Sequence, residues 1–336
     1  MNPAPASFEH VGRLTDDIGI FEHADHSVPR RHLGYCLDDV ARALVVVVRA
    51  PEQTPRLIEL THRYLNFVAF AQAEDGRCHN RLGLDRRWKD VPSVEDCWGR
   101  ALWGLGTAAA RSVDGEIRQR AADRFALSAR WRCGHRRTMG FAALGAAEML
   151  TVVPDDASSR TLLASAATTI GGRTGSALWP WPESRLTYAN AVLPDALMAV
   201  GEHLHDARAL DDGLVLLGWL LDLETSGSHL SVTPVGGWTF GEPRPGFDQQ
   251  PIEVAALADA CARAFRLTGD SRWSQGVERA VRWFLGDNDA GTPLYDPVTG
   301  GGCDGLHIDG RNANQGAEST LAMIATLQHA HQPVLT

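Results

Sequence analysis

The chain alternates between long apolar stretches and loops rich in glycine, proline, aspartate and histidine. Within the apolar stretches hydrophobic residues recur every three to four positions, and the one-by-one alternation of a half-buried strand is almost absent. The pattern therefore predicts a mostly α-helical protein. Eleven helices are expected at residues 38–49, 55–73, 95–111, 116–131, 138–152, 157–170, 194–205, 207–223, 251–267, 271–286 and 314–330, with a twelfth near 8–14.

These helices are of two kinds. Some, such as TMGFAALGAAEML, are apolar on nearly every side and rich in small residues, which is typical of a helix buried all round. Others, such as DSRWSQGVERAVRWFLGD, carry charges on one face, which is typical of a helix that borders solvent. The two kinds alternate with a period of roughly 45–65 residues, the pattern of repeated helical hairpins.

This alternation predicts one all-α domain, residues 1–336, built as an (α/α)6 toroid with about six buried helices inside about six exposed ones. An open α-solenoid of stacked helix pairs is the alternative architecture. A solenoid would place fewer polar groups at the starts of its buried helices than this chain does.

The charge balance narrows the class of partner. The chain has 32 Lys and Arg against 41 Asp and Glu, a net charge of −9, and no basic run. This composition argues against nucleic-acid and anionic-membrane partners. Neither a basic-then-apolar leader nor a run of eighteen apolar residues is present, so we expect a soluble cytoplasmic protein. The sequence does not determine the oligomeric state.

The cysteines and glycines predict no cofactor and no metal. Six cysteines are scattered without a C-x-x-C pair, so neither a zinc framework nor a disulfide scaffold is expected. The glycine-rich segment GGCDG lacks the Lys-Ser/Thr of a P-loop and the spacing of a dinucleotide-binding turn.

Acidic, amide and aromatic side chains gather at the starts of the helices predicted to be buried. In a toroid of hairpins all inner helices run in one direction, so their N-termini share one end of the ring. The candidates at or just before these starts are Asp38, Asp39, Glu95, Asp96, Tyr188, Asn190, Asp248, Gln249, Gln250, Glu253, Asn314, Gln315 and Glu318. Loops and helix starts at the same end would add His79, Trp98, Trp179, Trp181 and Trp238.

A structural explanation exists for each acid taken singly. Aspartate at a helix start is commonly an N-cap, and Asp38 with Arg42 is an ordinary i,i+4 ion pair, as is Asp96 with Arg100. Capping, however, needs one acceptor per helix, and several helix starts supply two. Asp39, Glu95 and Glu253 remain as the acids that capping does not require.

Such a funnel suits carbohydrate chemistry. Sugars bind through planar hydrogen-bonding groups and aromatic faces, and cleavage of a glycosidic bond needs one protonated and one ionised carboxyl. The expected catalytic residues are Asp39 or Glu95 on one side and Asp248 or Glu253 on the other. The remaining candidates, with Arg100, would bind substrate. Trp179, Trp181 and Trp238 are expected at the rim, with an indole face open to the cleft.

Several segments carry a family resemblance. They are GYCLDDVARAL, DGRCHNRLGLDRRWKD, SVEDCWGRALWGLG, FDQQPIEVAALADACARAFRLTGDSRW and NQGAESTLAMIATL. On these the chain resembles the six-hairpin (α/α)6-barrel carbohydrate-active proteins, and it is similar to helical proteins associated with bacterial glycosyltransferases and mannoside phosphorylases. The resemblance implies a cleft at the inner-helix N-termini and a carbohydrate ligand, with a mannose-containing one as a candidate. It carries over no catalytic residue.

Three functions compete at this point. The first is a glycoside hydrolase acting on an oligosaccharide, expected to invert the anomeric configuration. The second is a sugar isomerase or epimerase of the N-acylglucosamine epimerase kind, which relies on histidine bases. Acids and amides, rather than histidines, stand at the helix starts, which favours hydrolysis. The third is a non-catalytic carbohydrate-binding partner of a glycan-synthesis enzyme.

Overall fold

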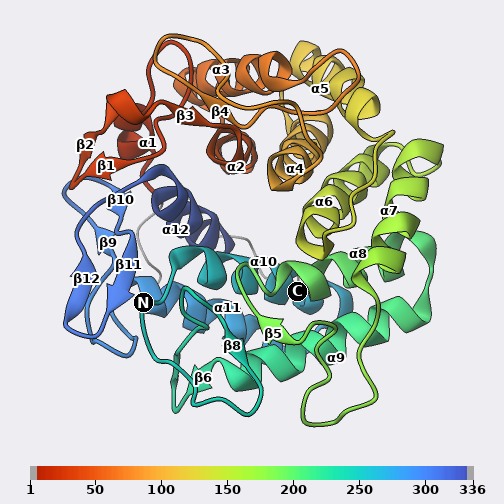
Figure 1. The fold of residues 1–336 in the computed structure, drawn as a ribbon, viewed down its shortest axis with the longest axis vertical. Coiled ribbons are helices and arrows are strands. Elements are labelled where there is room, and N and C mark those ends of the chain that lie inside the picture. Colours follow the sequence, from red (N-terminus) through yellow and green to blue (C-terminus); the bar gives the residue numbers. More distant parts are fainter. Residues whose placement is uncertain (1–5, 331–336) are drawn as a thin grey trace.

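Helices arranged in two concentric rings make up the molecule (Figure 1). The structure, a computed structural model, describes residues 6–330. The inner helices are α2 (Leu37–Val48), α4 (Asp96–Arg111), α6 (Arg136–Val152), α8 (Val192–Leu204), α10 (Pro251–Thr268) and α12 (Ala317–His329). The outer helices are α1 (Glu9–Leu14), α3 (Pro55–Ala71), α5 (Gly115–Ser128), α7 (Ala157–Ile170), α9 (Ala207–Leu223) and α11 (Ser271–Phe284).

The inner ring is closed. Each inner helix contacts the next one along the chain, and α12 returns to contact α2. Helices α3, α5, α7, α9 and α11 each pack on the inner helix that precedes them, and α1 packs on α12. The predicted all-α (α/α)6 toroid is therefore confirmed and the open solenoid is wrong. The expected helices are all present, with ends that differ from the prediction by about three residues or fewer.

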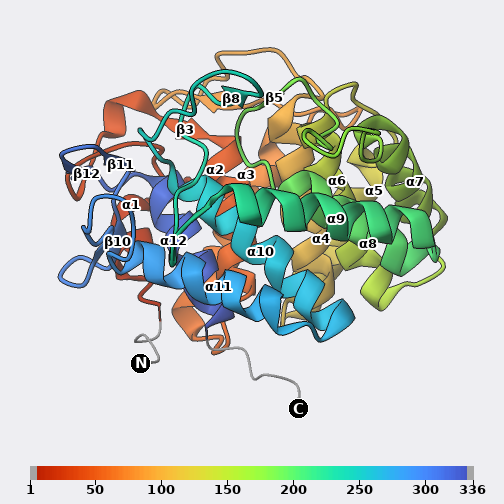
Figure 2. The ribbon, with the colours of Figure 1, turned by 90° about the horizontal axis from the view of Figure 1, so that it is seen from below.

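The strands of the described chain are short pieces within the loops, as expected. They are β1 (Ala24–Asp25), β2 (Val28–Pro29), β3 (Tyr35–Cys36), β4 (Arg81–Leu82), β5 (Arg185–Leu186), β6 (Thr225–Ser226), β7 (His229–Leu230), β8 (Trp238–Thr239), β9 (Tyr295–Asp296), β10 (Gly301–Gly302), β11 (Gly305–His307) and β12 (Gly310–Asn312). They form antiparallel pairs, β1–β2, β3–β4, β5–β8, β6–β7, β9–β10 and β11–β12. In side view β3, β5 and β8 lie toward one end of the ring (Figure 2).

Glycines explain how closely α4 and α6 pack. A Cβ added at Gly106 would overlap the carbonyl oxygen of Gly145, and one added at Gly145 would overlap that of Leu102. The two backbones therefore approach each other where both helices lack a side chain. This accounts for Gly106 of SVEDCWGRALWGLG, a position that a better helix former could otherwise occupy.

Replacing either glycine should destabilise the fold. We expect Gly106→Ala and Gly145→Ala each to lower the free energy of unfolding by about 1–3 kcal/mol, because the added methyl group must push two buried helices apart. Urea unfolding followed by circular dichroism measures the change. Gly134→Ala is the matched control, since a Cβ there meets no atom within 4 Å. Equal stability of all three variants would contradict this account of the packing.

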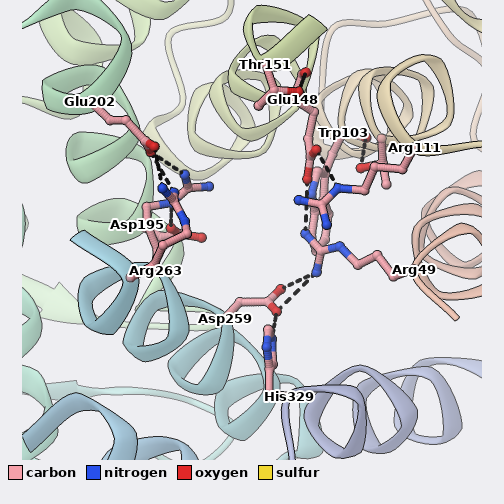
Figure 3. A network of polar contacts seen from close by, with 12 residues as sticks. Arg49, Trp103, Arg111, Glu148, Thr151, Asp195, Glu202, Asp259, Arg263 and His329 are labelled. Atoms are coloured by element: carbon pink, nitrogen blue, oxygen red, sulfur yellow. Dashed lines mark hydrogen bonds and ion pairs between the residues drawn. The ribbon is translucent and has the colours of Figure 1, made fainter. Parts of the chain in front are cut away.

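Ion pairs fill the end of the ring formed by the C-terminal halves of several inner helices (Figure 3). Arg49 lies between Asp259, at 3.1 Å, and Glu148, at 3.7 Å, and His329 binds the same Asp259 carboxylate at 2.5 Å. Burial acts to raise the pKa of Asp259, but Arg49 and His329 outweigh it, so the pKa lies below its ordinary value. The buried Asp259 and Glu148 carboxylates at this end of the barrel are thus paired with cations.

The six cysteines are all buried and unpaired. Burial raises the pKa of the Cys36, Cys78, Cys97, Cys261 and Cys303 thiols, so the reactive thiolate is scarce at neutral pH. We expect a thiol reagent such as Ellman's reagent to label essentially none of them in the native protein at pH 7.5 and all six after unfolding in guanidinium chloride. Rapid labelling of one or more native cysteines would show that the thiols are accessible.

Candidate active site

Five of the six outer helices have a capped start that no inner helix has, and the short outer helix α1 is the exception. Outer helices α3, α5, α7, α9 and α11 each begin with a Thr or Asp whose side chain accepts a backbone N–H of the first turn. None of the six inner helices has such a side-chain cap. The acids at the inner-helix starts are therefore not caps, and the structural explanation that the sequence left open does not hold for them.

A cleft of about 890 Å³ lies at the end of the ring where the inner helices begin. Residues at and just after β5 and residues between β7 and β8 complete its wall. Eight of the predicted residues line it: Asp38, Asp39, Asp96, Arg100, Tyr188, Gln250, Glu253 and Glu318. They come from segments far apart in sequence, so the starts of α2, α4, α10 and α12 meet at one cleft, although Asp248, also expected there, does not line it. Its volume falls within the range of about 300–1,000 Å³ typical of ligand sites.

The floor of the cleft holds carboxylates that outnumber their cations. Arg42 of α2 donates to Asp39 at 2.5 Å and to Glu318 of α12 at 2.6 Å, so one guanidinium serves two acids. Glu22 lies close by, since its carboxylate, the Asp39 carboxylate and the Cys36 sulfur lie within 4.8 Å of one another. Arg81 of β4 pairs with Glu22.

Asp39 is the acid most affected by this crowding. It is buried at the cleft floor, with 3 % of its surface exposed. Burial raises its pKa, Arg42 lowers it, and the negative charges of Glu318, Glu22 and Asp38 raise it again, with a net result of about 7. A carboxyl with this pKa is partly protonated at neutral pH and can both donate and accept a proton.

Asp38 keeps one oxygen free. Its Oδ2 accepts hydrogen bonds from Asn80 Nδ2 at 3.0 Å and from the Cys36 thiol at 3.4 Å. Its Oδ1 is buried without a hydrogen-bond partner, and Arg100 Nε lies 3.3 Å away but outside hydrogen-bonding geometry. The buried Oδ1 atom thus faces Arg100, and 17% of the Asp38 side chain remains exposed in the cleft.

The ion pairs predicted from sequence spacing are wrong. Arg42 binds Asp39 rather than Asp38, and Arg100 approaches Asp38 rather than Asp96. The reason is tertiary: Arg42 reaches across to Glu318 on α12, and Asp38 turns toward Asn80. Asp39 is therefore paired with an arginine, and its pKa is nevertheless raised.

Glu253 lines the cleft with both carboxylate oxygens engaged. One accepts the backbone N–H of Ala189, and the other accepts the backbone N–H of Asn190 at 3.1 Å and its Nδ2 at 3.0 Å. Ala189 has a positive φ of 44°, an unfavourable conformation for this residue type. Burial and the neighbouring Glu224 raise the pKa of Glu253 to about 8. These contacts indicate that Glu253 holds the turn containing Tyr188.

Asp96 is held by two hydroxyl groups. Thr138 Oγ1 donates to its Oδ1 at 2.5 Å, and the phenol of Tyr188 donates to its Oδ2. Burial and the Asp96 charge raise the pKa of the Tyr188 phenol well above its ordinary value, so this group remains a donor. Glu95, one residue earlier, is mostly exposed and lines a neighbouring pocket rather than the main cleft.

The tryptophans do not form the predicted rim. Trp98 and Trp181 are fully buried, and Trp98 donates its indole N–H to the Ser128 carbonyl. Trp179 and Trp238 are half-buried and pack edge to face, with ring centroids 5.5 Å apart. None of these four residues lines the cleft. Trp179 and Trp181 both pack on Trp219 of α9, a contact that sequence spacing did not reveal.

Other predicted ligand-binding residues have structural partners away from the cleft. Gln249 accepts from the Trp283 indole and donates to Asp289. Gln315 donates to Asp296. His79 stacks on Trp88, Asn314 accepts the His26 backbone N–H, and Asn190 donates to Glu253, which does line the cleft. Asp248, which was predicted to be catalytic, lies 3.9 Å from His307 and lines neither pocket.

Some cleft residues carried no sequence signal that we used. Glu22 and Asp304 lie in loops without helical periodicity, and Arg81 belongs to a strand of two residues. Burial raises the pKa of Asp304, which also accepts the Gly316 N–H at 2.7 Å. Their placement depends on loop paths, which hydrophobic periodicity does not predict.

One set of ligand atoms in the cleft is close enough together to be considered for a metal ion, namely those of Glu22, Cys36 and Asp39. Arginines already bind both carboxylates. Burial and the charges of Asp39 and Asp38 raise the pKa of the Cys36 thiol well above its ordinary value, whereas a metal requires the thiolate. The chemistry of this set fits an acid cluster better than a metal site.

Solved structures of other proteins share the fold of this chain. No protein-family model and no curated protein sequence matches the chain. Solved structures that share its fold include a sugar epimerase from a ruminal bacterium, with a TM-score of 0.71, 10% identity, and coverage of 97% of this chain and 95% of that one. The cellulase Cel9M of C. cellulolyticum, in complex with cellobiose, has a TM-score of 0.65, 9% identity, and coverage of 93% and 87%.

A third similar structure is the GH76 α-mannanase BT2949 of Bacteroides thetaiotaomicron, with a TM-score of 0.63, 10% identity, and coverage of 96% of this chain and 93% of that one. These structures are (α/α)6-barrel enzymes, so the predicted fold resemblance is confirmed. Hydrolases and an epimerase both occur among them, and at identities this low the likeness shows the fold alone.

Proposed function

We propose that this protein is a glycoside hydrolase that cleaves an oligosaccharide in the cleft at the inner-helix N-termini. The observation that carries the proposal is the Asp39 carboxyl, which is buried at the cleft floor among three other acids and has a pKa of about 7. Glycosidic cleavage needs a carboxyl that is protonated at the working pH and donates to the leaving oxygen. Asp39 has that property.

Asp38 is our candidate for the second carboxylate. It lines the cleft with 17% of its side chain exposed, Arg100 lies 3.3 Å from its buried Oδ1, and Asn80 and Cys36 donate to its Oδ2. In an inverting reaction it would activate water while Asp39 protonates the leaving group. Glu253 fits this role less well because three N–H groups already occupy its oxygens. Glu95 and Asp248 do not line the main cleft.

A sugar isomerase or epimerase is the second candidate, because an epimerase shares the fold. Such an enzyme of the N-acylglucosamine epimerase kind would need histidine bases facing the sugar. Of the histidines in the described chain, His23 alone lines the cleft, and half of its side chain is exposed to solvent. The carboxylate-rich floor therefore favours hydrolysis. A binding protein without activity would retain the cleft but has no use for a titrating acid at its floor.

The experiment is a substrate screen. Mannose-, glucose- and arabinose-containing oligosaccharides are incubated with the protein, with and without phosphate, and products are followed by mass spectrometry. Mannosides come first, because a fold relative is by name an α-mannanase. We expect shortened, water-added products with inverted anomeric configuration. Sugar phosphates would indicate phosphorolysis, and products of unchanged mass would indicate isomerisation, and either would overturn the proposal.

A further inference from the structure

A second pocket adjoins the cleft. It has a volume of about 490 Å³, and Asp96 and Tyr188 line both cavities. Residues before and within the first turns of α4 and α6 form much of its wall, including Glu95, Cys97 and His135. Its volume also lies within the range of about 300–1,000 Å³ typical of ligand sites. The cleft therefore continues beyond the acid cluster toward these two helix starts.

Tyr188 stands between the two cavities. Its phenol is fixed by the hydrogen bond to Asp96, and its backbone turn is fixed by Glu253. The Arg137 guanidinium lies 5.2 Å from the ring centroid, yet 42% of the residue remains exposed. An anchored tyrosine with exposed ring surface is the kind of group that covers the C–H face of a sugar.

The polar groups of the second pocket suit a neutral, hydroxyl-rich ligand. Arg137 and Glu183 are paired at 2.8 Å, so their charges largely cancel. Glu95 and His135 lie 3.7 Å apart with 64% and 69% of their side chains exposed, which leaves them free to bind ligand. Neither α4 nor α6 has a side-chain cap at its start. The pocket thus offers donors and acceptors together without a dominant charge.

We propose that the second pocket binds the sugar unit next to the one held over Asp38 and Asp39, with Tyr188 and Asp96 at the junction. The inference rests on the proposed function for the nature of the ligand. It reassigns Glu95, which the sequence suggested as a catalytic acid, to recognition of this second unit. The substrate class is then an oligosaccharide of at least two units rather than a monosaccharide.

The test measures binding separately from turnover. Dissociation constants of manno- and cello-oligosaccharides of one to four units are measured by calorimetry in the Asp39→Asn variant, with wild type as the reference for the monosaccharides. In either the manno- or the cello-oligosaccharide series, we expect the disaccharide to bind about tenfold or more tightly than the monosaccharide. The added substitutions Glu95→Gln and His135→Ala should remove most of that gain while leaving monosaccharide affinity within about twofold.

Glu116→Gln is the matched control, because Glu116 is a similarly exposed glutamate on outer helix α5. Circular dichroism and thermal unfolding verify that all variants fold. A gain from one unit to two that survives the Glu95 and His135 substitutions, or no gain at all, would overturn the second site. Sugar binding with the expected length dependence but without hydrolysis by wild type would overturn the proposed reaction and leave the second site standing.

Discussion

The substitution Asp39→Asn should lower kcat/KM on a hydrolysed oligosaccharide by about 100- to 10,000-fold, the usual contribution of a positioned general acid. Asparagine has nearly the shape of aspartate but cannot deliver the proton. Because the acid must be protonated and its pKa is about 7, wild-type kcat/KM should fall as the pH rises through about 7. Initial rates from pH 4 to pH 10 measure this alkaline limb.

Two comparisons keep this prediction specific to Asp39. Asp25→Asn removes a mostly exposed carboxylate on β1 outside the cleft and should retain wild-type kinetics. The residual kcat/KM of Asp39→Asn should no longer fall as the pH rises through about 7. A merely structural defect would not remove this pH dependence. An Asp39→Asn enzyme with the wild-type pH profile and more than a tenth of its activity would exclude Asp39 as the acid.

The substitution Glu253→Ala should cost about 3 kcal/mol or more of unfolding free energy, because it leaves three buried N–H donors from Ala189 and Asn190 without acceptors. Glu253→Gln should cost less, about 1–3 kcal/mol, since the amide oxygen replaces one acceptor. Both changes loosen the turn that carries Tyr188. Urea unfolding at pH 6 gives the values.

Glu253 also predicts how stability depends on pH. Its pKa in the folded protein, about 8, lies above the ordinary 4.5, so the folded state keeps a proton that the unfolded chain releases. Its contribution to stability is fully present below about pH 4.5 and is lost as the pH rises through about 8. Glu253→Ala should remove this part of the pH dependence, whereas Glu242→Ala, in an exposed loop, should not. Stability of Glu253→Ala equal to wild type would contradict the structural role.

The fold could be predicted because periodicity reports burial. Helix α11 shows a charged face toward solvent and α6 shows none, and this difference alone separates the outer ring from the inner one. The common direction of the inner helices then brought Asp39 and Glu318 to the same end, although 279 positions separate them. The glycine contacts between α4 and α6 were not predictable, because they depend on which helices cross and where.

The candidate site was only partly predictable. Which acid an arginine selects depends on groups across the barrel, so Arg42 bound Asp39 and Glu318 rather than the acid at i−4. The positions of loop residues also depend on contacts with distant parts of the barrel. Trp181 stacks on Trp219 in the interior, and Glu22 enters the cleft from a segment with no periodic signal. Sequence spacing located the end of the ring where the site lies but not the pairings within it.

The measurement that tests hydrolysis at this cleft most directly is the source of the product's oxygen. Wild type and Asp39→Asn are each incubated, in water enriched in ¹⁸O, with the oligosaccharide that the screen identifies. The masses of the products are measured by mass spectrometry after a brief reaction. The account predicts shortened sugars carrying one solvent oxygen at the new reducing end, formed by wild type and nearly abolished in Asp39→Asn. Sugars of unchanged length and mass but altered stereochemistry, or hydrolysis that Asp39→Asn leaves intact, would contradict it.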